Sequence, residues 1–494
     1  MKTTAYITTS IAYANGQPHI GHALELVQAD FFARAIKQQG VDVRLLTGTD
    51  EHGLKVQQAA ERQGVTPQEF VNQHSSVFQT LADLLSVSYA RFIRTSDQDH
   101  QALAQAFWRI CQKNGDIYKR HYRAWYDIKE ETFLGLVDEY PDPTVFNVEP
   151  RFIEMIDEEN YFFRLSRYKD QIISLLSSAE LKITPLSRAK ELLNFITDKG
   201  MEDISISRDA LKLSWGVPVP DDEQQVMYVW FDALTNYLTA CSSIDGTGKI
   251  LPDIFWPPTL HCVGKDIHRF HSMIWPAMLL SAGLPLPEEV LVHGFIVAED
   301  GRKMSKSIGN VIDPIPLIER FGSDAVRWFL LKEMHTTDDS RLKVERISEV
   351  YSADLANTLG NLVNRLSAMA KQYCSGSVTI EPSEEMRALC TATTVDYGQA
   401  VKARNTQAAL QLAFNLAAFS NRSIEEYKPW QVAKLPERSK ELRQQLGSWF
   451  YCLQTVVHLL TPAMPVTADK LSWLAKRSGE IVIPQEVPIL FPRL

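Results

Sequence analysis

Two histidines flank a glycine close to the start of the chain, in the stretch PHIGHA at residues 18–23. His19 and His22 are three residues apart, so both rings would project from one face of a first helical turn. The N–H groups of that turn lack partners within a helix and attract phosphate, and imidazole rings can donate further hydrogen bonds to it. Gly21 has no Cβ, so a flat ring such as adenine could approach the backbone. The pattern indicates a nucleotide site, although so short a pattern also arises by composition, and many such histidines only cap a helix.

A pair of lysines provides the second candidate group. Lys303 and Lys306 stand in EDGRKMSKSIGN, residues 299–310, directly after a segment with strand character. The surrounding Gly, Ser and Asn residues permit movement, and two positive charges suit a leaving phosphate group. A KxxK pattern alone is typical of a solvated basic turn. Here KMSKS follows HIGH by a long interval within one α/β region, which chance seldom produces, so we interpret the two stretches as halves of one site.

The elements that must position these residues follow from hydrophobic periodicity. Residues 3–13 are rich in β-branched and aromatic side chains and are followed by turn residues, which predicts a strand. A helix is predicted from residue 20 to Gly40, because apolar residues recur there at helical spacing. Residues 41–53 have the pattern of the next strand. This strand–helix–strand order predicts a parallel sheet that binds ligands beyond the carboxyl ends of its strands.

The remaining sequence predicts an insertion into this α/β region and a helical region after it. The texture is aromatic and irregular from about residue 117 to 225, and strand patterns return in QVMYVWF, TLHCVG and EVLVHGFIV. Beyond about residue 350, long amphipathic helical patterns dominate. We therefore expect an α/β fold with a doubly wound, Rossmann-like parallel sheet, an inserted connective domain and an α-helical C-terminal domain. The expected boundaries are 1–116 and 226–350 for the α/β domain, 117–225 for the insertion and 351–494 for the helical domain.

Composition narrows the class of protein further. The 494 residues are 45% hydrophobic and 22% charged, as in globular proteins of two or three domains, and no apolar run is long enough for a membrane span. The N-terminus lacks the apolar core of a signal peptide, so we expect a cytoplasmic protein. Six cysteines without a CxxC pair argue against a disulfide framework and a structural zinc site. The net charge is −9, but residues 351–494 hold 15 basic against 12 acidic residues, whereas residues 1–350 hold 36 against 48. The helical region is thus the one suited to nucleic acid.

The stretches HIGH and KMSKS resemble the two signature motifs of the class I aminoacyl-tRNA synthetases, without a departure at any position. The resemblance implies an enzyme that activates an amino acid with ATP and Mg²⁺, releases pyrophosphate and transfers the acyl group to the terminal ribose of tRNA. Such an enzyme needs no covalent intermediate, so it acts by positioning the reactants and stabilising charge on phosphate. The resemblance assigns catalytic roles to His19, His22, Lys303 and Lys306. It assigns ATP contacts to Asn15, Gly21, Gly264, Asp266 and Lys306.

A longer set of stretches resembles the methionyl-tRNA synthetase family across essentially the whole chain: AYANGQPHIGHA, TGTDEHG, YVWFDALTNYL, GKDIHRFHSMIWPA and YKPW. The family's methionine pocket maps onto Ile11, Tyr13, Asp50, Trp230, Ala233, Tyr237 and His271. Asp50 could pair with the α-ammonium group of the substrate, and aromatic walls suit the polarizable methionine sulfur. Without the resemblance, Trp230 and Tyr237 also fit the pattern of core aromatics, and Lys265 beside Asp266 fits a structural ion pair.

One departure from the family concerns metal. Many methionyl-tRNA synthetases carry zinc-binding cysteine pairs in the inserted domain, whereas this chain has AWYDIKEETF at residues 124–133 and only the lone Cys111 nearby. The resemblance is therefore to the zinc-free type. We expect no zinc, and Mg²⁺ only as the companion of ATP.

The resemblance assigns the reading of the CAU anticodon of tRNA(Met) to three residues of the helical region, Asn361, Arg365 and Trp430. Asn361 and Arg365 are four residues apart, on one face of a predicted helix. An exposed aromatic ring can stack on a loop base while amide and guanidinium groups bond to base edges. A helix-surface pair and a buried tryptophan are the alternatives. No dimerising tRNA-binding module follows the helical region up to Leu494, so we expect a monomer.

Three other functions stay open at this point. A synthetase for leucine, isoleucine, valine or cysteine would share both motifs, but the first three usually carry a larger editing insertion, and the zinc ligands of the fourth are missing here. A nucleotidyltransferase that makes a small cofactor would share a histidine-rich ATP site, but the helical region and the intact KMSKS argue against it. The intact histidines and lysines likewise argue against a synthetase-derived RNA-binding protein without catalysis.

Overall fold

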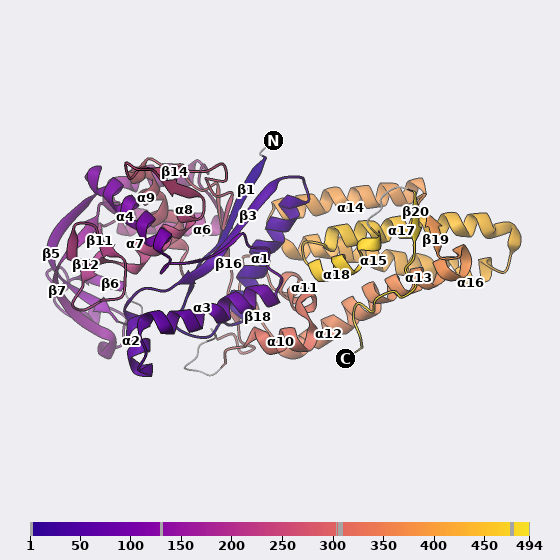
Figure 1. Ribbon diagram of the computed structural model, residues 1–494, viewed down its shortest axis with the longest axis horizontal. Helices are drawn as coiled ribbons and strands as arrows, with labels where there is room; N and C mark the ends of the chain where they lie inside the picture. Colours follow the sequence, from indigo (N-terminus) through magenta and orange to yellow (C-terminus); the bar gives the residue numbers. More distant parts are fainter. Residues whose placement is uncertain (1–2, 129–131, 303, 305–309, 475–478, 494) are drawn as a thin grey trace.

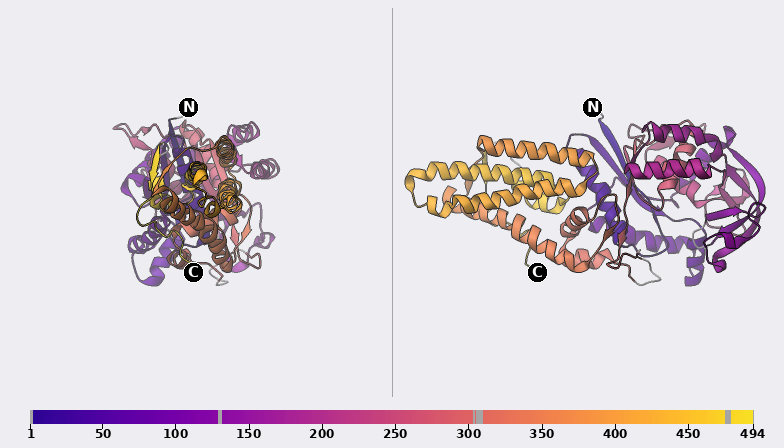
Figure 2. Two further views of the ribbon diagram at one scale, coloured as in Figure 1. Left: turned by 90° about the vertical axis from the view of Figure 1, so that its right-hand side faces the viewer. Right: turned by 180° about the vertical axis from the view of Figure 1, so that it is seen from behind.

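The computed structural model describes residues 3–128, 132–302, 304, 310–474 and 479–493. The molecule is elongated, with an α/β region at one end and a bundle of long helices at the other (Figure 1). The view from behind shows the same division, and in the view along the long axis the helices lie in front of the α/β region (Figure 2).

The α/β region is built on one seven-stranded sheet. Its strands are β1 (Thr4–Thr9), β2 (Ala12–Tyr13), β3 (Asp42–Asp50), β4 (Arg91–Arg94), β8 (Lys182–Thr184), β15 (Leu260–Gly264) and β16 (Glu289–His293). They pair in parallel in the order β2-β3-β1-β15-β16-β8, and β4 also pairs with β3. One half of the sheet extends from β1 through β3, and the other half extends from β1 through β15 and β16. Doubly wound sheets bind ligands at such a reversal of strand order, beyond the carboxyl ends of the strands. The predicted doubly wound parallel sheet is therefore confirmed.

The helix that carries both histidines is α1 (Ile20–Lys37), which follows β2. Its apolar residues Leu24, Val27 and Phe31 are buried in the same core as residues of β1, β3 and β15. Each large apolar side chain buried in this way contributes about 1.5–3 kcal/mol. The apolar stripe therefore sets the rotation of α1 about its axis, and with it the direction of the histidines.

Further helices and one hairpin complete the α/β region. They are α2 (Leu54–Gln63), α3 (Pro67–Leu84), α4 (Gln98–Lys113), α7 (Val229–Leu234), α8 (Asn236–Thr239), a π-helical turn at Phe270–Ile274, α9 (Trp275–Ala282), and the hairpin β13 (Ser242–Ile244) with β14 (Ile250–Pro252). The stretch QVMYVWF, predicted as a strand that helps complete the sheet, is a strand only up to Met227 and begins α7 at Val229. That prediction was wrong because so short an apolar run has no periodicity that separates a strand from a buried helix.

The predicted insertion, residues 117–225, includes separate antiparallel sheets and one strand of the main sheet. Part of it forms two antiparallel sheets, made of β5 (Ile117–Asp127), β6 (Thr132–Leu136), β7 (Ile153–Phe163) and β9 (Ile204–Ser205), and of β10 (Ser207–Asp209), β11 (Pro218–Val219) and β12 (Asp222–Met227). Between them, α5 (Lys169–Ser177) and α6 (Leu186–Lys199) flank β8, which extends the main sheet beside β16. The sequence pattern does not reveal β8, because a three-residue strand is too short to show a period of two.

The helical region follows the second half of the α/β region. Its elements are α10 (Pro314–Phe321), α11 (Ser323–Glu333), α12 (Val344–Val350), a π-helical segment at Tyr351–Gly360, α13 (Asn361–Cys374), α14 (Glu384–Lys402), α15 (Thr406–Tyr427), α16 (Pro429–Val432), α17 (Ser439–Leu460) and α18 (Pro465–Lys470). Two short strands, β19 (Ser377–Thr379) and β20 (Glu480–Val482), pair along its side. In the described part of the chain, none of the helices has the length and apolar character needed to span a membrane.

One buried arginine fixes the helical region to α1. The side chain of Arg327, on α11, is fully buried, and its Nη2 lies 2.6 Å from Oδ2 of Asp30 on α1. The same guanidinium donates to the carbonyl oxygens of Leu85, Pro462 and Ala463 at 2.8–3.0 Å. A buried guanidinium with all of these acceptors tolerates little displacement, because each lost partner would leave an uncompensated polar group. Arg327 therefore holds the helix that carries the histidines against the helical bundle.

Candidate active site

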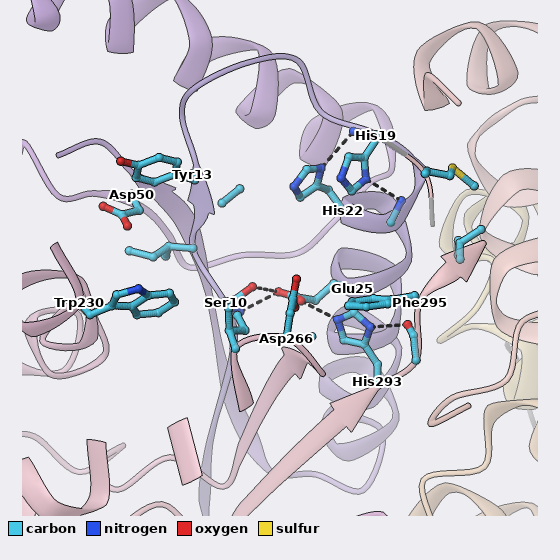
Figure 3. A pocket seen from close by; sticks show the side chains of 18 of the residues that line it. Ser10, Tyr13, His19, His22, Glu25, Asp50, Trp230, Asp266, His293 and Phe295 are labelled. Carbon is cyan, nitrogen blue, oxygen red and sulfur yellow. Dashed lines mark hydrogen bonds and ion pairs between the residues drawn. The ribbon is translucent and has the colours of Figure 1, made fainter. Parts of the chain in front are cut away.

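A cavity of about 400 Å³ opens at the carboxyl edge of the main sheet (Figure 3). Its walls come from the segment after β1, the first turns of α1, the end of β3, α7, and the segments after β15 and β16. The sequence-predicted residues that line it are Ile11, Tyr13, His19, Gly21, His22, Asp50, Trp230, Gly264 and Asp266. The cavity lies where the predicted sheet topology placed it, beyond the strand ends.

The two histidines cap the helix that they begin. Nδ1 of His19 accepts a hydrogen bond from the N–H of Gly21 at 3.1 Å, and Nδ1 of His22 accepts from the N–H of His19 at 3.0 Å. Their rings are stacked with centroids 3.8 Å apart. Because each Nδ1 is an acceptor, the proton of each neutral ring is on Nε2. The cap thereby selects the tautomer in which Nε2 can donate to a phosphate oxygen.

Gly21 is required by the cap itself. A Cβ at this position would lie 2.9 Å from Cε1 and 3.0 Å from Nδ1 of His19. Any side chain would therefore push the capping ring away from the backbone N–H that it accepts from. The approach of an adenine ring to Gly21, for which the sequence argument invoked this residue, stays a prediction.

A buried ion pair between Glu25 and His293 forms the floor of the cavity beside the histidines. Oε1 of Glu25 accepts from the N–H and the hydroxyl of Ser10 at 2.7 and 2.5 Å, and Oε2 lies 2.7 Å from Nε2 of His293. Nδ1 of His293 lies 2.9 Å from the carbonyl oxygen of Gly294. Both ring nitrogens face acceptor oxygens, an arrangement that favours the doubly protonated imidazolium. Burial lowers the pKa of His293, but the hydrogen bond and charge of Glu25 outweigh it and raise this pKa.

The residues predicted to hold the amino acid lie in two layers. Ile11, Tyr13, Asp50 and Trp230 line the cavity, and the other three predicted pocket residues, Ala233, Tyr237 and His271, are buried and do not line it. The ring of Trp230 stacks on Phe270 with centroids 3.7 Å apart and meets His271 edge-on. The structure therefore brings four of the seven residues to the cavity and places three in the layer behind Trp230.

This second layer is tied together by a hydrogen bond between Tyr237 and His271. The Tyr237 hydroxyl lies 2.7 Å from Nε2 of His271, whose Nδ1 lies 3.0 Å from the carbonyl oxygen of Ile267. Burial lowers the pKa of His271 to about 4. The ring is thus neutral near pH 7, with Nδ1 as the donor to Ile267 and Nε2 as the acceptor from Tyr237.

A buried carboxylate, Asp232, joins α7 to the segment after Asp50. Its two oxygens lie 2.6 Å from Nδ1 of His52 and 2.7 Å from Nε2 of His100. Burial alone would raise the pKa of Asp232, but the charges and hydrogen bonds of the two histidines lower it to about 2. This network therefore connects α7, which carries Trp230, to the segment that follows Asp50 and to α4. No local sequence pattern signals this network, because His52, His100 and Asp232 are far apart in the chain.

Of the remaining residues predicted to contact ATP, Gly264 and Asp266 line the main cavity and Asn15 does not. Gly264 is packed against its neighbour, since a Cβ there would lie 2.8 Å from Oδ1 of Asp266. Asn15 lines a separate cavity of about 550 Å³ beside α2 and α3, so the structure does not bring it to the main cavity. Lys303 and Lys306 lie outside the described residues, although Met304 between them lines the main cavity.

The three residues predicted from sequence to read tRNA lie on α13 and α16 of the helical region. Asn361, the first residue of α13, is exposed, and Arg365 one turn later lies 2.7 Å from a carboxylate oxygen of Glu425 near the end of α15. Trp430, on α16, is 43% exposed. The alternative of a buried tryptophan is therefore excluded. The rest of the prediction, that these residues read an anticodon, stays a prediction.

Metal ligands are a separate question. Within residues 3–128, 132–302, 304, 310–474 and 479–493, no group of three or more His, Cys, Asp or Glu side chains is arranged to hold a metal ion.

The doubly wound parallel sheet and the histidine-capped α1 beside its central strand, with the cavity at the strand ends, are the features of the class I aminoacyl-tRNA synthetases. The family model described as tRNA synthetases class I (M) matches residues 5–145 and 141–367. The methionine–tRNA ligase of Brucella suis is 41% identical over 479 residues, which cover 94% of this chain and 90% of that protein. The Bacillus subtilis methionine–tRNA ligase is 38% identical over 489 residues, which cover 95% of this chain and 72% of that protein. The chain therefore belongs to the methionyl-tRNA synthetase family.

Solved structures agree with this assignment. A crystal structure of Mycobacterium tuberculosis methionyl-tRNA synthetase bound by methionyl-adenylate matches with a TM-score of 0.90 and 35% identity, over 99% of this chain and 100% of that chain. The free form of the same protein matches with a TM-score of 0.84 and 32% identity, over 100% of this chain and 99% of that chain.

Proposed function

We propose that this protein activates L-methionine with ATP to methionyl-adenylate, releases pyrophosphate, and transfers the methionyl group to tRNA(Met). One observation carries the proposal: donors suited to phosphate and a carboxylate beside an aromatic wall line the same cavity. His19 and His22 stand on one side of it and Asp50 and Trp230 on the other. Family membership adds independent support, because the relatives named above are methionine–tRNA ligases.

The nucleotide side supplies positioning and charge stabilisation. In the reaction, a carboxylate oxygen of methionine attacks the α-phosphorus of ATP, and the bond from that phosphorus to the bridging oxygen of pyrophosphate breaks. The Nε2–H groups of His19 and His22 donate to phosphate oxygens whose negative charge grows during the attack. They are held by the backbone cap, so they need no reorganisation as the charge develops.

The methionine side supplies recognition. Asp50 accepts hydrogen bonds from the α-ammonium group, while Ile11, Tyr13 and Trp230 contact the side chain of the substrate. A thioether makes favourable contacts with aromatic rings, and such contacts distinguish methionine from branched aliphatic side chains. Ala233, Tyr237 and His271 support this wall from the second layer.

Lys303 and Lys306 neutralise the departing pyrophosphate, and Mg²⁺ enters with ATP as part of the substrate. This role predicts that Lys306→Ala slows methionine activation far more than it weakens methionine binding, because the lysine charge matters mainly as the leaving group develops. Single-turnover adenylate formation and equilibrium methionine binding separate the two effects. Equal losses in both would contradict the role.

Residues 351–494 bind the anticodon of tRNA(Met), both initiator and elongator, with Trp430 stacking on a base and Asn361 and Arg365 bonding to base edges. Trp430→Ala should lower kcat/KM for tRNA by roughly 5- to 100-fold, because loss of one base–aromatic stack costs about 1–3 kcal/mol. ATP–pyrophosphate exchange should be unchanged. The control is Leu435→Ala, which removes another exposed apolar side chain of this region. A loss of exchange together with charging would mark Trp430 as a structural residue instead.

The decisive experiment is ATP–pyrophosphate exchange with each of the twenty amino acids. We expect strong exchange with methionine alone. Exchange with leucine, valine or cysteine and none with methionine would overturn the specificity. The same preparation, run through size-exclusion chromatography with light scattering, tests the proposed monomer. Translation in the cytoplasm is the proposed setting.

A further inference from the structure

A segment from outside the main sheet is bonded to the wall of the cavity. The wall segment, residues 294–297, follows β16, and its first three residues line the cavity. It pairs with residues 339–342, which precede α12: Ser340 N–H donates to Phe295 O at 2.9 Å, and Leu342 N–H donates to Val297 O at 3.1 Å. The first residue of this second segment, Asp339, adds a side-chain contact, because its Oδ1 accepts from the N–H of Phe295 at 2.9 Å.

The other oxygen of Asp339 binds a lysine from a different strand end. Nζ of Lys265 lies 2.5 Å from Oδ2 of Asp339 and 4.3 Å from the centroid of the Phe295 ring. Lys265 directly follows Gly264, the last residue of β15, which lines the cavity. A single carboxylate therefore ties together the segments that follow β15 and β16. Lys265, which the sequence suggests as a member of a structural ion pair, thus has Asp339 as an ion-pair partner.

At one end of the two segments, the backbones are closely packed where Gly294 meets Asp338. A Cβ at Gly294 would lie 2.0 Å from the carbonyl oxygen of Asp338. No side chain can be accommodated at that distance without movement of one of the two chains. Just beyond the two segments, Lys343 pairs with Glu299.

The wall segment belongs to the nucleotide side of the cavity. Phe295 and His293 lie on the same side as His19 and His22, away from Tyr13, Asp50 and Trp230 (Figure 3). A displacement of the wall segment would therefore change the space next to the phosphate-binding histidines and leave the methionine side in place.

We propose that Asp339 is a positioning residue for nucleotide binding: through Lys265 and the Phe295 amide it holds the 294–297 wall segment against the cavity. This inference rests on the proposed function and deepens it. Asp339 does not line the cavity, so it acts through the wall segment and not by contact with ATP. Its effect should fall on the use of ATP and spare methionine.

Steady-state ATP–pyrophosphate exchange on the full chain tests the proposal. Asp339→Ala should raise KM for ATP roughly fivefold to tenfold, because it removes one charge-assisted and one ordinary hydrogen bond at a partly exposed site. KM for methionine and the thermal unfolding temperature should stay close to wild type. Asp339→Asn keeps an oxygen for the Phe295 N–H but loses the charge that pairs with Lys265. Its KM for ATP should therefore lie between those of the wild type and Asp339→Ala. The control is Asp338→Ala, whose exposed carboxylate makes none of these contacts.

A double-mutant cycle makes the test independent of any one variant. If Lys265 and Asp339 act as one clamp, Lys265→Met should also raise KM for ATP, and the double variant should be no worse than Asp339→Ala alone. Additive effects would overturn the clamp, as would equal rises in KM for ATP and for methionine. If wild type exchanges with methionine and Asp339→Ala matches it, the positioning role is wrong while the proposed function stands. Absence of methionine-dependent exchange in the wild type would instead refute the proposed function.

Discussion

The two sides of the cavity are built in different ways. On the nucleotide side, His19 and His22 are held by backbone N–H groups of the helix that they begin. On the amino-acid side, Trp230 is held by its stack on Phe270, with Tyr237 and His271 bonded to each other behind it. The first side is thus positioned by the backbone and the second by side-chain packing.

This difference predicts different consequences of mutation. A donor fixed by the backbone gives its full stabilisation as charge grows in the transition state, so its loss should appear in kcat. A wall made of packed side chains contributes to substrate binding before and during the reaction, so its loss should appear mainly in KM. The variants below separate the two sides, from the largest expected effect to the smallest.

The largest effect is expected from His19→Ala. Removal of one preorganised donor to a developing charge lowers kcat by about 10²- to 10³-fold in comparable sites. Loss of the N-cap should also lower the free energy of unfolding by about 1 kcal/mol. ATP–pyrophosphate exchange and chemical denaturation measure the two effects. His19→Asn restores a good N-cap residue without the imidazole, so it should recover stability but not activity. Recovery of activity by the asparagine variant would show that His19 acts only as an N-cap. The two sides of the cavity would then not differ in the way proposed.

Asp50→Asn should give the next largest effect, on the other side of the cavity. Loss of a charge-assisted hydrogen bond to the methionine α-ammonium costs about 1.5–3 kcal/mol, which raises KM for methionine roughly 10- to 100-fold. KM for ATP should change little. Asp42→Asn, at the exposed start of the same strand, is the matched control and should behave as wild type. A larger effect on ATP than on methionine would place Asp50 on the nucleotide side.

The sequence predicted the parts of the site whose position follows from local backbone. His19 and His22 begin the first helix after the first strands, and Gly264 ends another strand that Asp266 follows. Parallel strands end at one edge, so these residues had to come together once the sheet was predicted. The doubly wound sheet itself was predictable for the same reason, because its longer strands show clear apolar patterns.

The parts that were missed depend on contacts between distant segments. Glu25 and His293 are 268 residues apart, and His52 and Asp232 are 180 residues apart, so no local pattern signals either pair. Glu25 lies three residues after His22 on the same helix face. That spacing was the one local sequence feature that could have placed Glu25 at the cavity. The second-layer position of Tyr237 and His271 was equally hidden, because family resemblance assigns residues to a pocket without saying which of them reach its surface.

A smaller effect is expected from Tyr237→Phe, which tests whether the second layer supports the methionine wall. The substitution removes the hydroxyl that bonds to His271 and leaves a buried ring nitrogen without its donor, which costs about 1–3 kcal/mol of stability. We expect a lower unfolding temperature and a rise of a few-fold in KM for methionine, with kcat almost unchanged. Tyr6→Phe is the control, because it removes a hydroxyl that donates to the Tyr237 carbonyl in the same core. It should lose stability without affecting KM for methionine, and an equal KM effect in both variants would mean that the second layer acts only through general stability.

The smallest effect is a dependence of ATP use on pH through His293. Its pKa is raised above the ordinary value of 6.5, chiefly because the favourable contact with Glu25 outweighs burial, so the folded protein holds this proton more tightly than the unfolded chain. The stabilisation by the ion pair is therefore complete below pH 6.5 and is lost as the pH rises through the raised pKa. Glu25 and Asp266 are the carboxylates nearest to the ring, and with the imidazolium lost their negative charges would oppose the phosphates of ATP. KM for ATP should thus rise a few-fold at alkaline pH while KM for methionine stays level, and His293→Gln should raise KM at neutral pH and flatten the profile. A profile that is equally steep in the glutamine variant would show that another group on the nucleotide side titrates in this range.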